Sequence, residues 1–138
     1  MDHDKILEQL VAHEGMKTTV YRCPAGRLTI GVGRNLEDLG ITPDEAMILL
    51  ANDVERCCAE LDLTGPWWRA LDDVRQRVLV DMVFNLGIRR FLGFKKMLRH
   101  VGFQAWDLAA DEMLDSRWAD QVGMRAKTLS DMMRSGQD

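Results

Sequence analysis

The chain has 138 residues, of which 46% are hydrophobic and 29% are charged, a composition typical of one globular domain with a sizeable core. A net charge of −4 argues against a nucleic-acid binder, and no apolar run is long enough to span a bilayer, so no membrane insertion is expected. The N-terminus lacks the basic region and apolar core of a signal peptide, so we expect a cytoplasmic protein.

The three cysteines are odd in number and two of them are adjacent, which argues against a disulfide framework. No C-x-x-C pair occurs and the three histidines are scattered, so the sequence predicts no metal site. The adjacent pair, Cys57 and Cys58, is expected to face a helical core rather than to react.

Apolar residues recur with helical spacing near the N-terminus, at Ile6, Leu7, Leu10 and Val11. The spacing predicts an amphipathic helix whose buried stripe reaches Glu14, with Gly15 as its stop. Burial and the negative end of the helix dipole would both disfavour a charged carboxylate at Glu14. Glu14 is therefore a candidate acid, although most glutamates at helix ends are solvated and inert.

A hairpin is predicted after this helix. Residues 18–22 indicate a strand, residues 23–26 indicate a turn with proline at its second position, and residues 27–33 indicate a second strand. Residues 34–40 are expected to form a loop.

Alternation along the second strand predicts that Leu28, Ile30 and Val32 pack inward. The opposite face carries Thr29 among glycines such as Gly31, and this nearly bare backbone suits close approach by a flat ligand. The alternative is a bulged hairpin that uses its glycines for twist alone.

The rest of the chain reads as a helical body. Thr42, followed by Pro43 and Glu45, predicts the start of a long helix that runs to about residue 62. A second helix over 72–86 is apolar on nearly all sides at its centre and is expected to be the core of a bundle. Shorter helices are predicted over 93–101, 104–114, 116–121 and 124–133. Most of the four tryptophans are expected to fill the core rather than to stack on sugars.

Glu14, Cys23 and Thr29 are separated by eight and by five residues, and this spacing resembles the catalytic signature of the phage-type lysozymes, the endolysins of T-even and related phages. Further blocks follow in the order of that family: TIGVG at 29–33, TPDEA at 42–46, DMVFNLG at 81–87, GF at 93–94 and SRW at 116–118, with Gln121, Arg125 and Ala126.

The resemblance implies a mostly helical α+β chain with a two-lobed lysozyme fold. A small N-terminal lobe over 1–41 would carry the hairpin and the active site. A connecting helix over 42–62 would join it to a helical C-terminal lobe over 63–138.

The activity implied by the resemblance is hydrolysis of the β-1,4 bond between N-acetylmuramic acid and N-acetylglucosamine in peptidoglycan. Glu14 would be the general acid, Cys23 would stand in for a carboxylate that assists the attack, and Thr29 would position the water. No metal or cofactor is implied. Asn85 would line the substrate cleft, together with the bare backbone at Gly31, and Arg125 matches an arginine that pairs with the catalytic glutamate.

The chain departs from the family at two positions. Cys23 replaces the usual aspartate, and its thiol could be a base, a nucleophile or a bystander, so inverting and retaining chemistry both stay open. Arg34 stands where a histidine is often found, and the short loop after it predicts a trimmed small lobe. Two alternatives follow: a lysozyme-fold protein that binds peptidoglycan without cutting it, and a thiol hydrolase using Cys23 and His13.

The resemblance also implies a partner and a location. The enzyme would be a monomer that collects in the cytoplasm of the host bacterium and lyses the host cell late. Release through the inner membrane would depend on a holin, a membrane-permeabilising phage protein.

Overall fold

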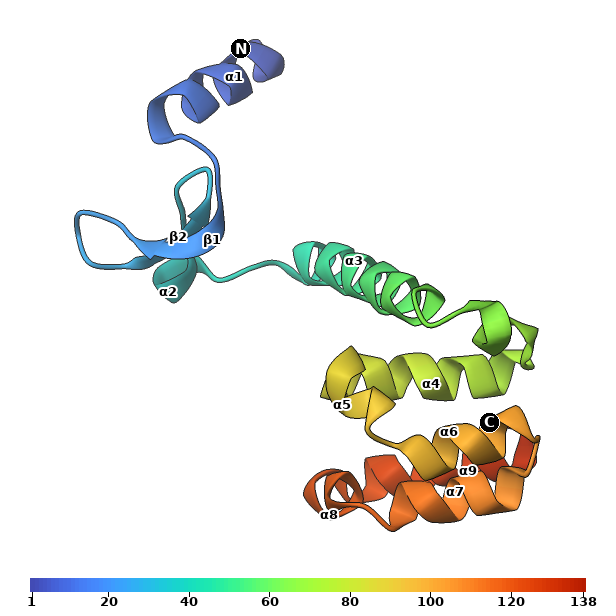
Figure 1. Cartoon of the computed structure of the whole chain (residues 1–138). Coiled ribbons are helices and arrows are strands. Elements are labelled where there is room, and N and C mark those ends of the chain that lie inside the picture. The colour runs from blue at the N-terminus through green and yellow to red at the C-terminus, as the bar shows by residue number, and fades with distance from the viewer. The chain divides into compact units, whose positions relative to one another are not determined.

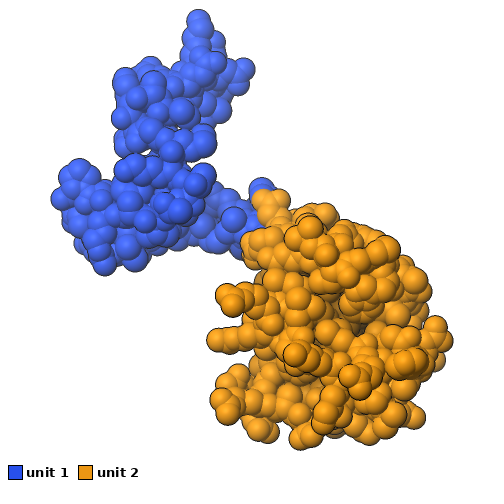
Figure 2. All heavy atoms as spheres, in the orientation of Figure 1, with its two compact units in different colours: residues 1–49 blue, residues 50–138 orange.

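The computed structural model describes all 138 residues, which divide into two compact units, Met1–Leu49 and Leu50–Asp138 (Figure 2). The predicted class, a mostly helical α+β chain, is confirmed (Figure 1). No helix combines the length and the apolar character that a membrane crossing requires.

The elements of the first unit are the helix α1 (His3–Glu14), the strands β1 (Lys17–Arg22), β2 (Leu28–Gly31) and β3 (Arg34–Asn35), the short helix α2 (Leu36–Leu39) and the first turns of α3 (Pro43–Asp62). The second unit holds the rest of α3, followed by η1 (Pro66–Ala70), α4 (Asp73–Leu86), α5 (Ile88–Leu92), α6 (Lys95–Gly102), α7 (Trp106–Leu114), α8 (Arg117–Val122) and α9 (Met124–Ser135).

Helix α1 ends at Glu14, as predicted, and both of its ends are locally encoded. The Asp2 carboxylate accepts a hydrogen bond from the Lys5 amide at 3.1 Å, and Gly15 caps the other end with a φ of 73°. The predicted burial of the apolar stripe is wrong: no residue of α1 is buried, and Leu7 is 60% exposed. Helical periodicity places residues on one face but does not supply the surface that covers it.

Strands β1, β2 and β3 form an antiparallel sheet in that order. A bulge interrupts the pairing of β1 with β2, so the hairpin is bulged, while the role of its glycines toward a ligand stays a prediction. The predicted turn between the two strands is confirmed, since the Gly26 amide donates to the Cys23 carbonyl at 2.7 Å and Gly26 has a φ of 81°.

The second strand ends earlier than predicted, and the predicted loop over 34–40 is wrong. Gly31 and Gly33 have φ values of 69° and 71°, so the chain reverses there and Arg34 returns to pair with Ile30. The short helix α2 follows, with the Asn35 side chain accepting from the Asp38 amide as its cap.

The predicted inward face of this strand is also wrong. Thr29 is 3% exposed, whereas Leu28 and Ile30 are only half-buried. Thr29 lies at the centre of the sheet, paired with Tyr21 on one side and with Asn35 on the other. Alternation identifies two faces, but the strands and turns around them decide which face is covered.

Helix α3 begins with the predicted reciprocal cap. The Glu45 amide donates to Thr42 Oγ1 at 3.2 Å, and the Thr42 amide donates to Glu45 Oε2 at 2.8 Å. Near its end, Cys57 is buried as predicted and Cys58 is half-buried.

The second unit contains the hydrophobic core. Helix α4 runs from the predicted cap Asp72 to the predicted stop Gly87, and its apolar centre is buried as expected. Trp68 and Trp118 are buried in the core and the other two tryptophans pack against it, which confirms the core-filling prediction. The sequence reading missed η1 and α5, because each is a single short turn beside a proline or a glycine.

Candidate active site

The Glu14 carboxylate lies against the backbone of Gly33. A Cβ atom at position 33 would come within 3.1 Å of Glu14 Oε2 and 3.2 Å of its Cδ, so any larger residue there would crowd the carboxylate. Glu14 is exposed and accepts no hydrogen bond within its own unit, so the predicted burial of this residue is wrong. The carboxylate is thus placed by packing and stays open to an incoming group.

Cys23 and Thr29 are brought together by one backbone carbonyl. The Cys23 amide and the Thr29 hydroxyl both donate to the Arg27 carbonyl oxygen, at 3.0 Å and 2.9 Å. Because the Thr29 hydroxyl proton points to Arg27, the free lone pairs of its oxygen can accept a further hydrogen bond.

The Cys23 thiol differs from the other two cysteines in its acidity. Hydrogen bonding to the backbone at Arg27 lowers the pKa of the Cys23 thiol, and bonding at Ala25 and Thr29 acts in the same direction against a smaller effect of desolvation. Desolvation raises the pKa of Cys57 and that of Cys58. Cys23 is therefore the most readily ionised thiol of the chain.

Glu37 on α2 is a residue that the sequence reading missed. Its carboxylate accepts from the Leu28 amide at 2.9 Å and lies 3.3 Å from Arg27 Nη1 and 3.6 Å from Arg22 Nη1. The hydrogen bond from the Leu28 amide lowers the pKa of Glu37, and Arg27 adds to this shift. The ionised side chain of Glu37 therefore holds the turn that carries Cys23. In the sequence Glu37 was only one acidic residue in a segment predicted to be a loop, so its role could not be recognised there.

Arg34 and Glu45 form the second polar link that was missed. The guanidinium donates to both carboxylate oxygens of Glu45, at 2.8 Å and 2.9 Å, and to the Gly40 carbonyl at 3.2 Å. Glu45 was predicted as a capping residue, but its partner Arg34 lies eleven residues away and no local pattern connects the two.

Two residues that the resemblance places at the substrate lie in the second unit. The Asn85 side-chain oxygen accepts from Trp118 Nε1 at 2.7 Å, which joins α4 to α8. Arg125 pairs with Asp81 at 2.8 Å. Their contact with substrate, and the pairing of Arg125 with Glu14, stay predictions.

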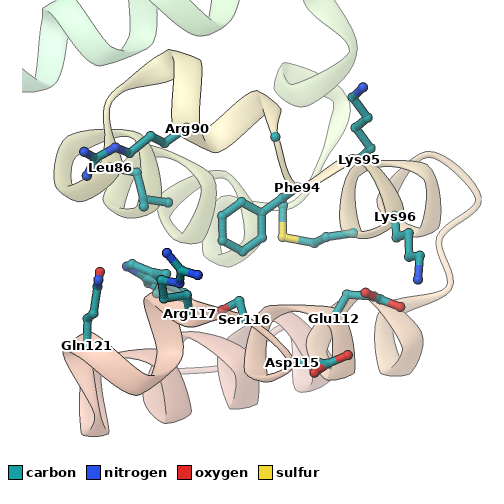
Figure 3. Close-up of a pocket in the computed structure, with 13 residues that line it drawn as sticks. Leu86, Arg90, Phe94, Lys95, Lys96, Glu112, Asp115, Ser116, Arg117 and Gln121 are labelled. Carbon is teal, nitrogen blue, oxygen red and sulfur yellow. The ribbon is translucent and has the colours of Figure 1, made fainter.

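A hollow of the second unit has a volume of about 810 Å³ and lies between two layers of helices (Figure 3). Arg90, Lys95 and Lys96 line it from α5 and α6, and Glu112, Asp115, Ser116, Arg117 and Gln121 line it from α7, α8 and the turn between them. On its apolar side the rings of Phe94 and Trp118 pack edge to face, with their centroids 6.0 Å apart. The hollow thus offers charges of both signs around an apolar wall.

Nowhere in the chain do three His, Cys, Asp or Glu side chains converge as a metal site would require.

Comparison with known proteins places the chain in a family. The family model described as phage lysozyme matches residues 11–135. The chain is 26% identical to "Probable T4-type lysozyme 1" of Dictyostelium discoideum, over 95% of this chain and 94% of that protein. It is also 26% identical to "Pre-baseplate central spike protein Gp5" of Enterobacteria phage T4, over 94% of this chain and 27% of that protein.

The alignment with the Dictyostelium protein spans 160 positions, which is more than the whole of this chain, so that relative has residues that this chain lacks. The family match covers the hairpin, the connecting helix and the helical unit together. The predicted resemblance is therefore confirmed. The chain belongs to the phage lysozyme family, whose members are glycoside hydrolases that degrade peptidoglycan, and this membership implies muramidase activity.

Proposed function

We propose that this lysozyme hydrolyses the β-1,4 bond between N-acetylmuramic acid and N-acetylglucosamine, with Glu14 as general acid and with Cys23 and Thr29 assisting the attack of water. One observation carries the proposal: the same small unit holds a carboxylate beside Gly33 and a cysteine and a threonine whose backbone amide and hydroxyl, respectively, donate to the Arg27 carbonyl. Glycoside cleavage needs one group that protonates the leaving oxygen and another that supports the attack.

Glu14 is suited to the first role. Its carboxyl has no hydrogen-bond partner in its own unit, so it is free to donate a proton to the glycosidic oxygen. The bare backbone at Gly31 and Gly33 lets a sugar ring approach the acid closely. Gly31 is for this reason among the proposed substrate contacts.

Cys23 and Thr29 are suited to the second role. The lowered pKa of the thiol increases the fraction of thiolate available to accept a proton from water. The Thr29 oxygen, whose own proton is donated to Arg27, can accept the other hydrogen of that water and so orient its lone pair. This arrangement supplies a base without the carboxylate that Cys23 replaces.

The second unit would contribute further contacts to the polymer. Asn85 and Arg125 are the proposed substrate contacts there. The mixed charges around the hollow in Figure 3 suit the peptide stems of peptidoglycan, which carry free carboxylates and amines.

In its biological setting we propose that the enzyme is a monomer, collects in the cytoplasm of a host bacterium and lyses that host after a holin opens the inner membrane. The test is expression in bacteria with and without a holin. Lysis is expected only when the holin is present, and prompt lysis without it would contradict this route.

The catalytic proposal is tested by release of new reducing ends from purified peptidoglycan. Wild type should release them, and Glu14→Gln should lower the rate about 10²- to 10⁴-fold, because the general acid is lost. Glu8→Gln, on the same exposed helix, is the matched control and should keep wild-type activity.

A thiol hydrolase or a pure binder would give different results in the same assay. A thiol hydrolase would survive Glu14→Gln and fail in Cys23→Ser. A pure binder would release no reducing ends in any variant but would still sediment with peptidoglycan.

A further inference from the structure

We propose that Arg34 and Glu45 are a positioning pair that holds the Glu14 carboxylate in its working place by fixing the turn on which it packs. The inference rests on the proposed role of Glu14 as general acid. Neither side chain would touch the substrate, so both act through Gly33.

The first step is the contact between Glu14 and the β2–β3 turn. The Glu14 carboxylate lies beside Gly33, where an added Cβ atom would come within 3.1 Å of Glu14 Oε2, and Gly33 holds a φ of 71°. A shift of this turn therefore moves the wall on which the acid rests. The turn has only two residues between its paired strands, Val32 and Gly33, so its position follows directly from that of Arg34.

The second step is the attachment of Arg34. Its guanidinium binds Glu45 through two hydrogen bonds of 2.8 Å and 2.9 Å and binds the Gly40 carbonyl at 3.2 Å. Such a bidentate arrangement fixes the orientation of both groups as well as their distance. Glu45 is itself held by the Thr42 amide at 2.8 Å. The first turn of α3 is thereby tied to the residue that follows Gly33.

The third step is that stability alone does not account for this pair. The side chains of Arg34 and Glu45 are 39% and 38% exposed, and ion pairs at this exposure contribute little to folding. The first unit has no apolar core that could place the turn instead. Hydrogen bonding from Arg34 also lowers the pKa of Glu45 to about 2, so the link persists at every pH at which a glycosidase acid works.

The experiment compares Arg34→Ala, Arg34→Lys and Glu45→Gln with the control Arg134→Ala. Arg134 is 38% exposed, contacts two carboxylates and one carbonyl, and lies in the second unit, where it bonds none of the proposed site residues. The values of kcat and KM are measured on soluble peptidoglycan chains, and Tm is measured for each variant.

We expect Arg34→Ala to lower kcat by about 10- to 100-fold with KM within about twofold, because a misplaced acid slows the chemical step more than binding. Arg34→Lys should recover part of kcat, since it restores the charge without the bidentate geometry. Glu45→Gln should also lower kcat, and this variant tests the same link if Arg34→Ala does not fold. Arg134→Ala should lower Tm about as much as Arg34→Ala and leave kcat unchanged.

Folded Arg34→Ala and Glu45→Gln variants with wild-type kcat would overturn the inference. The same would follow if Arg134→Ala lowered kcat as much as they do. Failure of the catalytic proposal is distinguishable, because it would appear as an active Glu14→Gln enzyme.

Discussion

The two units of this lysozyme are held together by different forces. Every buried apolar side chain lies between Cys57 and Met133, in the helical unit, whereas Thr29 is the one buried residue of the small unit. The small unit is instead organised by polar links from Glu37 to Arg27 and Leu28 and from Arg34 to Glu45. The proposed catalytic groups therefore lie on a framework of directional hydrogen bonds. Such a framework fixes the positions of these groups but contributes less than a packed core to the free energy of unfolding.

Truncating the core should show the difference most strongly. Leu79 on α4 is completely buried, and Leu79→Ala should lower the free energy of unfolding by about 2–5 kcal/mol, because it removes packed methyl groups and leaves a cavity. Leu39→Ala, at a 73% exposed leucine of α2, should change it by less than about 0.5 kcal/mol. Urea unfolding monitored by circular dichroism measures both values, and a similar loss for the two variants would contradict the comparison.

The helical unit has one polar link of its own that should matter. Arg75 is buried and donates to the Met133 and Arg134 carbonyls and to Asp72, and it stacks on Trp106. Arg75→Ala should cost about 3 kcal/mol, since it leaves these partners without a buried donor.

The neighbouring Arg77 serves as the matched control for Arg75. Arg77 pairs only with exposed carboxylates, and Arg77→Ala should cost less than about 1 kcal/mol in the same urea titration. Equal losses for the two arginines would show that burial does not distinguish them.

The titration of Glu45 should report on its link with Arg34. Its folded pKa of about 2 lies below the ordinary value of 4.5, so the small contribution that this exposed pair makes to stability is complete above the ordinary value and is lost as the pH falls through about 2. The carboxyl carbon of Glu45 should titrate near pH 2 by NMR. The stability difference between wild type and Glu45→Gln should shrink over the same range, and a midpoint near 4.5 would rule out the bidentate link in solution.

The smallest expected effect concerns the thiols and leaves stability unchanged. Iodoacetamide near pH 7.5 should alkylate Cys23 faster than Cys57 or Cys58, since the pKa of Cys23 is lowered and those of the other two are raised. Peptide mass spectrometry after brief exposure gives the order. Alkylation of Cys57 before Cys23 would contradict this order of acidity.

Residues that form their contacts nearby in the sequence were predictable. Thr42 with Glu45 gave the start of α3, and Asp72 and Gly87 gave the bounds of α4, because a cap bonds within its own turn. The spacing of Glu14, Cys23 and Thr29 indicated the family that the comparisons confirm.

Contacts that depend on how the chain folds back were not predictable. The glycine-rich strand suggested a flat ligand surface, but the sequence could not show that Gly33 reverses the chain and meets Glu14. The link from Arg34 to Glu45 and the burial of Thr29 likewise depend on this reversal. The catalytic roles themselves stay predictions.

The most direct test of the account is digestion of purified peptidoglycan in water enriched in ¹⁸O, followed by mass spectrometry of the new sugar ends. For the wild-type enzyme we predict N-acetylmuramic acid at these ends, carrying one ¹⁸O atom. For Glu14→Gln we predict almost no product. New ends on N-acetylglucosamine, or anhydro ends without ¹⁸O, would contradict hydrolysis of the proposed bond.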